Sequence, residues 1–486
     1  MKKISRAWIM AAIFIATFMT SVEVTIVTTA LPEIISALHG LRFQSWIMSS
    51  YLLTTAISTL IYGKLADTYG RKILFQLGVV LFTLGSFLSS ISINIFWLIA
   101  ARALQGCGAG AVIPLTFTII ADVYAFKDRA RIMAFTNTAW GLSALIGPLL
   151  GGFLVENLSW HWVFFVNVPL GILVWLIMHF RYIEAPTPHS QMKIDSWGCW
   201  WLASGLTALL IGIQLLQQIP LVGWLLIIVS LGLLVVFLLH EQRSSHPLLP
   251  LSIFKNKTFK IQIITATILS GILIGYQIYF PIWLQSLYHI GATEAGLVVT
   301  SSSVCWLAAS FAIGRLLSNF APRKIALVVI TIQATAYLGL LLAGSHFPYW
   351  LFYFVAAISG GGMGIVITMN IMLSQQLVST RLIASASAVV TLGRSLGQTL
   401  FTGIYGSIFN LVLAFHLSKS LQKSINQVIT GKSAGLTSKD LSLVKSALLS
   451  GLHSVFFLVI GLFILVLLCN CCLLYTSDAA DDTPCV

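Results

Sequence analysis

Long apolar runs recur from one end of the chain to the other and are separated by short polar connections. Each run holds about 18 to 25 residues, enough to cross a hydrocarbon layer of about 30 Å as a helix. We therefore expect an all-α polytopic membrane protein with about fourteen spans. The runs lie at roughly 8–31, 45–63, 73–95, 97–121, 132–156, 161–180, 197–217, 221–240, 261–284, 294–315, 324–344, 347–372, 384–413 and 449–470.

The connections divide the runs into two sets of six and a central pair. Two similar polar stretches, "GKLADTYGRK" and "GRLLSNFAPRK", fall after the second span of each set, as expected for halves related by a parallel repeat. We predict a six-helix bundle in 1–180, a linker with two extra transmembrane helices in 181–260, and a second six-helix bundle in 261–471. Residues 472–486 change abruptly to Asp and Ala, so we interpret them as a non-native tail.

Composition excludes an ordinary soluble enzyme. Charged residues make up 8% of the chain and hydrophobic residues 58%, whereas soluble domains average about 25% charged. The formal charge of +13 comes from Lys and Arg concentrated in alternate connections, which the positive-inside rule assigns to the cytoplasm together with the N-terminus. We therefore expect a multi-pass protein of the cytoplasmic membrane, in contact with lipids, and no nucleic-acid partner.

Glu23 is the acidic residue that the pattern places inside a span. A charge at the centre of a span costs about 2.5–3.5 kcal/mol on insertion scales, so it normally faces a cavity or a partner. Burial favours the neutral form of a carboxylic acid, which suits proton exchange. Two alternatives stay open: a purely structural pair with a buried cation, and a span end placed so that the carboxylate is wet. Arg102 and Arg394 are the basic residues well inside predicted spans.

Small residues mark two further features. The fifth span carries Gly147, Pro148, Gly151 and Gly152, which favour close and bendable helix packing, although static packing is an alternative reading. The loop after the second span places Asp67 and Arg71 four residues apart, an ion pair if the segment is helical. Gly63 and Gly70 would allow a tight turn in that loop.

These motifs together resemble the major facilitator superfamily. "GKLADTYGRK" is similar to its signature loop, "RALQGCGAG" to its fourth-span motif and "GPLLGG" to the fifth-span motif of its antiporters. "VEVTIVTTALP", "WHWVFFVNVPLG" and "GRSLGQ" resemble the fourteen-span drug:proton antiporters of the QacA/EmrB kind. The first-span acid is usually Asp in that family, so Glu23 is a departure that affects the detail of coupling.

The resemblance implies roles for individual residues. Glu23 would be protonated during export, and Arg102 would assist proton transfer. Asp122 would join Gly63, Asp67, Gly70 and Arg71 in a charge cluster that controls the cytoplasmic side. Gly147 and Pro148, with Gly151 and Gly152, would shape the span that closes the outer side.

We therefore expect proton-coupled export of amphiphilic drugs or toxic compounds by alternating access, without enzymatic catalysis, cofactor or metal. Aromatic residues could line a substrate cavity or merely pack: Trp140, Tyr276, Tyr279, Trp283 and Trp306. Two alternatives are a dedicated exporter of one metabolite or antibiotic, and a membrane enzyme acting on a lipid-linked substrate. In a double-membrane bacterium, the resemblance would also allow a periplasmic adaptor as partner.

Overall fold

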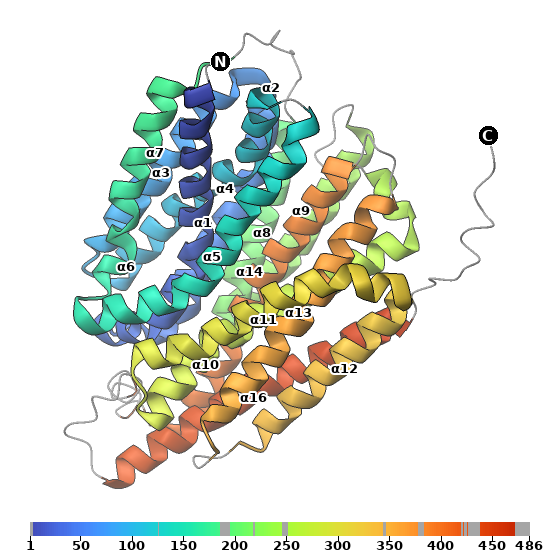
Figure 1. Cartoon of the computed structure of the whole chain (residues 1–486). Coiled ribbons are helices and arrows are strands. Elements are labelled where there is room, and N and C mark those ends of the chain that lie inside the picture. Colours follow the sequence, from blue (N-terminus) through green and yellow to red (C-terminus); the bar gives the residue numbers. More distant parts are fainter. Residues whose placement is uncertain are drawn as a thin grey trace.

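The computed structural model describes residues 3–124, 126–184, 195–216, 219–244, 251–343, 347–377, 383–418 and 438–471, and also residues 421 and 425. The predicted tail, 472–486, lies outside the described residues. The described chain is helical and contains no strand (Figure 1). Apolar runs form helices because lipid offers no hydrogen bonds to the backbone, and a helix satisfies its N–H and C=O groups internally.

The first half of the chain supplies one group of helices. These are α1 (Lys3–Ala37), α2 (Gln44–Tyr69) after the short 3-10 turn η1 (Leu41–Phe43), α3 (Arg71–Ser90), α4 (Ile95–Val123), α5 (Phe126–Asn157), α6 (His161–Phe165) and α7 (Asn167–Arg181). The predicted run 161–180 is thus broken at Val166 into α6 and α7. Figure 1 shows these helices side by side, with the N-terminus at one end of the group.

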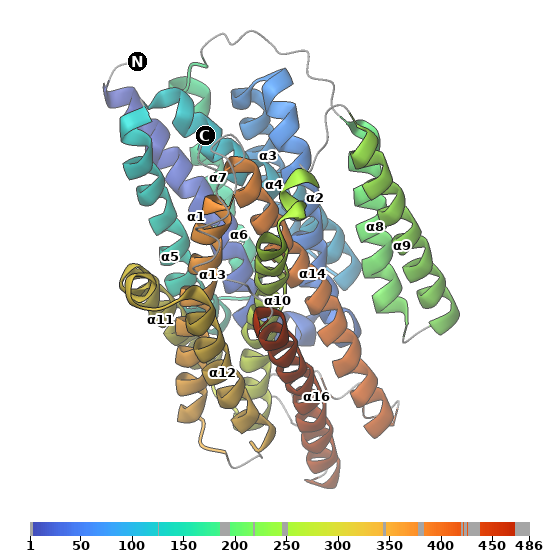
Figure 2. The same ribbon diagram turned by 90° about the vertical axis from the view of Figure 1, so that its right-hand side faces the viewer.

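The second half supplies the other group. These helices are α10 (Lys257–Tyr288) after the 3-10 turn η2 (Leu251–Lys255), α11 (Ala292–Asn319), α12 (Pro322–Leu341), α13 (Trp350–Gln376), α14 (Ile383–His416) and α16 (Ser438–Cys471). Between the groups in the sequence come α8 (Ser196–Leu215) and α9 (Pro220–Arg243), a hairpin that stands apart on one flank in Figure 2. Leucines of α8 pack with Leu53 of α2 and Leu396 of α14, so the hairpin touches both groups.

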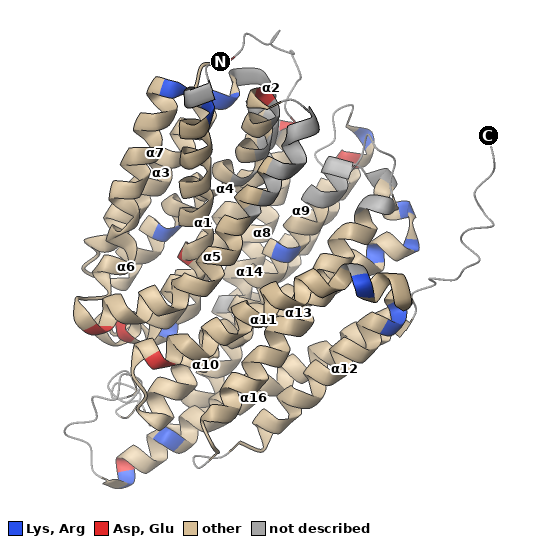
Figure 3. Cartoon of the chain, in the orientation of Figure 1, with Lys and Arg blue, Asp and Glu red and all other residues tan. Residues whose placement is uncertain are grey.

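Twelve of the described helices are long and apolar enough to cross a membrane by length and composition. A shorter apolar stretch, Trp197–Ile213, belongs to α8, and α2 is not among the twelve. The expected number of fourteen spans therefore stays a prediction. Lys and Arg gather mostly near helix ends, and long stretches between them carry no charge (Figure 3).

Helix starts follow local rules. Side-chain oxygens cap the first turns of three helices: Asn94 accepts from the Trp97 N–H at 2.8 Å, Asp195 from Gly198 at 2.8 Å, and Asn256 from Phe259 at 3.2 Å. Pro220 and Pro322 are the first residues of α9 and α12, where a missing N–H costs nothing.

Candidate functional site

Glu23 lies in α1 with its carboxylate fully buried, as is the side chain of Arg102 from α4. The two side chains form an ion pair between Arg102 Nη1 and Glu23 Oε1. The second carboxylate oxygen, Oε2, accepts a hydrogen bond of 2.7 Å from Asn167 Nδ2 of α7. Both oxygens of the carboxylate therefore have protein hydrogen-bond donors. The alternative in which Glu23 lies at a span end and contacts water is wrong for this conformation.

Arg102 is held from several sides. Its Nη1 donates to Gln105 Oε1 at 2.6 Å, and its Nε donates to the backbone oxygen of Ile47 at 3.1 Å. The guanidinium carbon lies 4.3 Å from the centre of the Tyr51 ring and 5.6 Å from that of Phe164. Ring faces attract a cation, so both rings stabilise the charge of Arg102 in addition to the carboxylate. Nη2 has no hydrogen-bond partner among the described residues.

The geometry makes this pair sensitive to change. Desolvation of two buried charges offsets most of their attraction, but removing one partner leaves the other charge uncompensated. Protonation of Glu23 also removes the counter-charge of Arg102, whose guanidinium then keeps only Gln105, the Ile47 oxygen and the two aromatic rings. Arg394 is not part of the site, because its Nε donates to Ser270 Oγ at 3.4 Å within the other group.

Three polar members of the site were missed by sequence reasoning: Tyr51, Gln105 and Asn167. Gln105 extends the network, since its Nε2 donates to Ser86 Oγ at 2.7 Å. Asn167 reaches Glu23 because the break at Val166 starts α7 at this depth. The available signal was a carboxamide inside an apolar run, which must find partners when buried.

A second cluster lies where α2 passes into α3. Gly70 joins the two helices with φ of +90°, a left-handed conformation that favours glycine. Arg71, the first residue of α3, forms an ion pair with Asp122 near the end of α4. The hydroxyl of Tyr182 donates to the other oxygen of Asp122 at 3.0 Å. The predicted meeting of Arg71 and Asp122 is thus present in the geometry.

Two expectations for this loop need correction. Gly63 does not form the turn, because α2 continues to Tyr69 and Gly70 alone makes the break. Asp67 and Arg71 lie on different helices, so they are not a pair on one helical face. The side chain of Asp67 lies outside the described residues.

Glu184, which sequence reasoning did not single out, binds the start of α3. Its Oε1 accepts from the backbone N–H of Arg71 at 2.7 Å, and its Oε2 accepts from that of Lys72 at 3.1 Å. A carboxylate is stabilised there by the free N–H groups and the positive end of the helix dipole. Burial and the nearby Glu184 raise the pKa of Tyr182, whereas Arg71 lowers it, so its hydroxyl keeps its proton and donates to Asp122.

The glycines of α5 face two different helices. A Cβ on Gly147 or Gly151 would meet Thr25 or Thr29 of α1, whereas a Cβ on Gly152 would meet the backbone of Thr293 in α11. Pro148 also meets α11, since its carbonyl lies against Gly296. α5 therefore packs closely within its own group along one face and against the other group along another.

Hydrogen bonds join the two groups along the halves of α1 and α5 that are far from the N-terminus. Glu156 accepts from the backbone N–H of Thr293 at 3.0 Å, and also from its hydroxyl. The hydroxyl of Thr300 donates to the Leu145 oxygen at 3.2 Å, and Gln285 Nε2 donates to the Thr29 oxygen at 3.4 Å. These contacts hold the groups together at that end.

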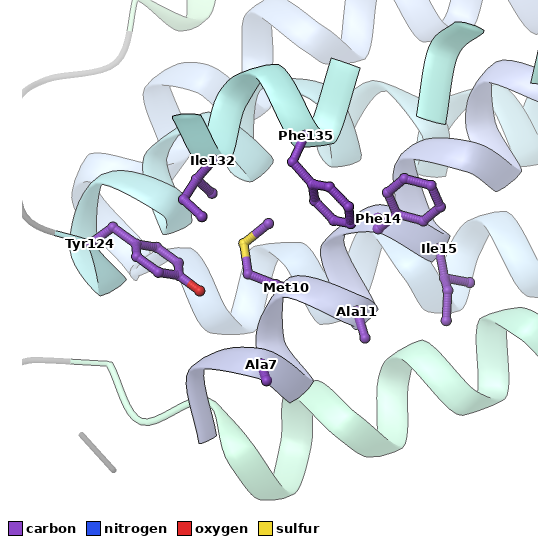
Figure 4. A pocket seen from close by; sticks show the side chains of 8 residues that line it. All are labelled: Ala7, Met10, Ala11, Phe14, Ile15, Tyr124, Ile132 and Phe135. Atoms are coloured by element: carbon purple, nitrogen blue, oxygen red, sulfur yellow. The ribbon is translucent and has the colours of Figure 1, made fainter. Parts of the chain in front are cut away.

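The aromatic residues proposed for a substrate cavity have different surroundings. Tyr276, Tyr279 and Trp283 are buried in a core to which both groups contribute, Trp306 is partly buried against it, and Trp140 is exposed. A groove of about 450 Å³ lies elsewhere, between α1 and the α4–α5 junction (Figure 4). Its lining is almost wholly apolar: Met10, Phe14, Ile15, Tyr124, Ile132 and Phe135. Among the described residues, no group of three or more His, Cys, Asp or Glu could hold a metal.

Comparisons with known proteins agree with this architecture. The chain is 31% identical over 409 residues to "Multidrug resistance protein 3" of Bacillus subtilis, covering 82% of this chain and 78% of that protein. It is 28% identical over 402 residues to "Multidrug transporter protein MdtP" of the same organism, covering 82% and 74%. The fold is similar to a crystal structure of a bacterial homolog of the human lysosomal transporter Spinster in an inward-facing, occupied conformation, with a TM-score of 0.71 and 16% identity over 97% of each chain.

The family profile described as Major Facilitator Superfamily matches residues 13–402, most of the described helices. The match agrees with the all-helical architecture and its two groups of helices. The chain belongs to the Major Facilitator Superfamily.

Proposed function

We propose that this protein exports amphiphilic small molecules across the cytoplasmic membrane by alternating access, in exchange for protons. The observation that carries the proposal is the fully buried pair of Glu23 and Arg102, on two helices long and apolar enough to cross the membrane. The likeness to two Bacillus subtilis proteins named for multidrug resistance and multidrug transport supports drugs as the substrate class.

Glu23 is the proton carrier of this proposal. A proton on Glu23 cancels the ion pair and leaves Arg102 with Gln105, the Ile47 oxygen and the Tyr51 ring. The difference between the paired and the protonated state is the local switch. One charge that crosses the whole membrane potential supplies about 2.3 kcal/mol per 100 mV, which biases the orientation of the two groups.

The end of the molecule that carries Gly70 and the N-terminus is the cytoplasmic end in this proposal. The Lys and Arg bias of the connections supports that orientation. The hydrogen bonds of Glu156, Thr300 and Gln285 then close the outer side, and the cluster of Arg71, Asp122 and Glu184 belongs to the cytoplasmic side. Opening of the outer side requires these outer contacts to break.

Transport by purified protein in liposomes tests the proposal. Liposomes that contain wild type, Glu23→Gln or Glu294→Gln are loaded with ethidium or one of a panel of other lipophilic dyes. A pH gradient of defined sign is then imposed across the liposome membrane. Glu294→Gln is the matched control, because Glu294 is an exposed carboxylate in the first turn of α11. We expect gradient-driven dye movement with wild type and the control, and none with Glu23→Gln.

Two results would contradict the proposal. Dye movement that persists unchanged after collapse of the proton gradient would reject proton coupling. Full transport by Glu23→Gln would reject Glu23 as the carrier, whatever drives the transport.

A further inference from the structure

Asn167 contacts the carboxylate of Glu23 with only half of its carboxamide. Its Nδ2 donates to Glu23 Oε2 at 2.7 Å. Its Oδ1 has no hydrogen-bond partner among the described residues, although the side chain is fully buried. A buried carbonyl oxygen without a donor is costly, and its position beside a titratable carboxylate calls for a physical reason.

Protonation changes what Glu23 needs from its neighbours. An ionised carboxylate only accepts hydrogen bonds, whereas a carboxylic acid also has an O–H to donate. Arg102 cannot receive that bond, because a guanidinium has donors and no acceptor. The oxygen of Gln105 already accepts from Arg102 Nη1. The unpartnered Oδ1 of Asn167 is an acceptor on the residue that already touches Glu23.

The charges that face Glu23 are few. Arg102 of α4 is the cation, and Tyr51 of α2 is the other titratable side chain, with its hydroxyl donating to the backbone oxygen of Thr20 at 3.1 Å. From the other helices around the pair come Ser86 of α3, Phe164 of α6 and Asn167 itself. None of these three side chains titrates.

We propose that Asn167 is a positioning residue that serves both protonation states of Glu23: its Nδ2 donates to the carboxylate, and after a half-turn of the carboxamide its Oδ1 accepts from the acid. The proposal rests on the proposed proton coupling and assigns a second residue to it. No covalent bond other than the O–H of Glu23 forms or breaks. The proton arrives on Oε2 and leaves from it.

Infrared titration of the purified protein tests this directly and needs no substrate. The carbonyl band of protonated Glu23 is assigned by its loss in Glu23→Gln, and its amplitude is followed with pH. Asn167→Leu keeps the approximate size but removes donor and acceptor. Asn167→Asp keeps an acceptor and places a second carboxylate beside Glu23, so that the pair shares a proton.

We expect the midpoint of the Glu23 titration to rise in the order wild type, Asn167→Leu, Asn167→Asp. In Asn167→Leu the carboxylate loses a charge-assisted hydrogen bond and the acid loses a weaker neutral one, so the midpoint moves up by the difference, about one pH unit or a tenfold change. The carbonyl band of Asn167→Leu also shifts to higher wavenumber, because the acid has lost its acceptor.

Asn470→Leu is the matched control. Asn470 is also buried, but its Nδ2 donates to the Thr265 hydroxyl at 2.8 Å and touches no carboxylate. We expect its titration midpoint to equal that of wild type. A merely structural role for Asn167 would alter yield or stability in both variants and leave both midpoints unchanged, and that result would overturn the proposal.

The test separates this proposal from the proposed function. An unshifted midpoint in Asn167→Leu, with proton-driven transport intact in wild type, overturns only the role of Asn167. A Glu23 band that does not titrate in wild type overturns both. Failure of dye transport with the expected order of midpoints contradicts the proposed function and supports the two-state role of Asn167.

Discussion

The ion pair between Glu23 and Arg102 makes a quantitative prediction about stability. In Arg102→Met the carboxylate of Glu23 stays buried with only the Asn167 donor. Breaking a buried pair from one side costs about 3–5 kcal/mol. The same change removes the cation above the Tyr51 ring, 4.3 Å away, a contact of about 1 kcal/mol or more. We expect Arg102→Met to be among the most destabilising single changes in the first group of helices.

The double variant Glu23→Gln with Arg102→Met has no buried charge at this site. Replacing a buried ion pair by neutral groups of similar volume is often neutral, so we expect the double variant to recover about 2–4 kcal/mol relative to Arg102→Met. Such non-additivity is the signature of a direct interaction. Two changes that acted independently would instead make the double variant the least stable of the set.

Thermal inactivation in detergent measures this cycle. Wild type, both single variants and the double variant are heated at pH 8, and the fraction that stays monodisperse by size-exclusion chromatography is recorded. Unfolding of a large membrane protein is generally irreversible, so the midpoints are compared at one heating rate. A single variant Arg102→Met with the wild-type midpoint, or a double variant less stable than both singles, would refute the reasoning.

Three further predictions concern other parts of the molecule. Glu184→Ala removes the acceptor of two N–H groups at the start of α3, so we expect it to lower the free energy of unfolding by about 1–2 kcal/mol. Tyr182→Phe leaves that acceptor in place and removes only the hydrogen bond to Asp122, so we expect a loss of about 1 kcal/mol. Thermal unfolding midpoints check this order, and equal midpoints contradict it. Gly152→Ala forces α5 away from Thr293 at a cost of about 1–3 kcal/mol and increases maleimide labelling of a cysteine placed at Thr300, whereas Gly232→Ala, where a Cβ meets nothing, leaves labelling unchanged. At the α8–α9 hairpin, burial raises the pKa of Asp195, but the Gly198 N–H and His240 lower it more, to below its ordinary value of 3.8. The hydrogen bonds of the ionised Asp195 carboxylate therefore stabilise the hairpin fully above about pH 4, and this stabilisation is lost as the pH falls below that. We expect hydrogen exchange of α8 to become faster in acid, and Asp195→Asn to abolish this dependence on pH.

The helices were predictable because every apolar run, whether it faces lipid or the protein core, must satisfy its backbone N–H and C=O groups internally. Their ends were less so: the predicted span ended at Gly63 and the polar residues after it indicated a loop, but α2 continues to Tyr69 because a helix extends beyond the apolar layer without penalty. The break at Val166 was also missed, since α6 and α7 form one continuous apolar run in sequence.

The residues of the site also differ in how strongly the sequence indicates them, because burial costs more for a charge than for a neutral amide. A charge in an apolar span is expensive, so Glu23 was identified, with Arg102 and Arg394 as its two candidate partners. Neutral amides carry a smaller penalty and give a weaker signal, so Gln105 and Asn167 were found only from the structure. Glu184 follows the end of α7 and resembles any solvated acid in sequence; its role depends on α3 starting beside it, which no local pattern encodes.

The hairpin of α8 and α9 makes the two flanks of the molecule mechanically unequal. On one flank, the groups meet through α5 and α11, whose backbones are in close contact at Gly152 and Gly296 and are joined by hydrogen bonds. On the other flank, three leucines of α8 pack against Leu53 of α2 and Leu396 of α14: Leu202, Leu206 and Leu210. Any rocking of one group against the other must shear this apolar layer. A two-fold plan of six helices and six helices thereby acquires two unlike flanks: rocking of one group against the other must separate closely packed backbones on one flank and slide leucine side chains past one another on the other.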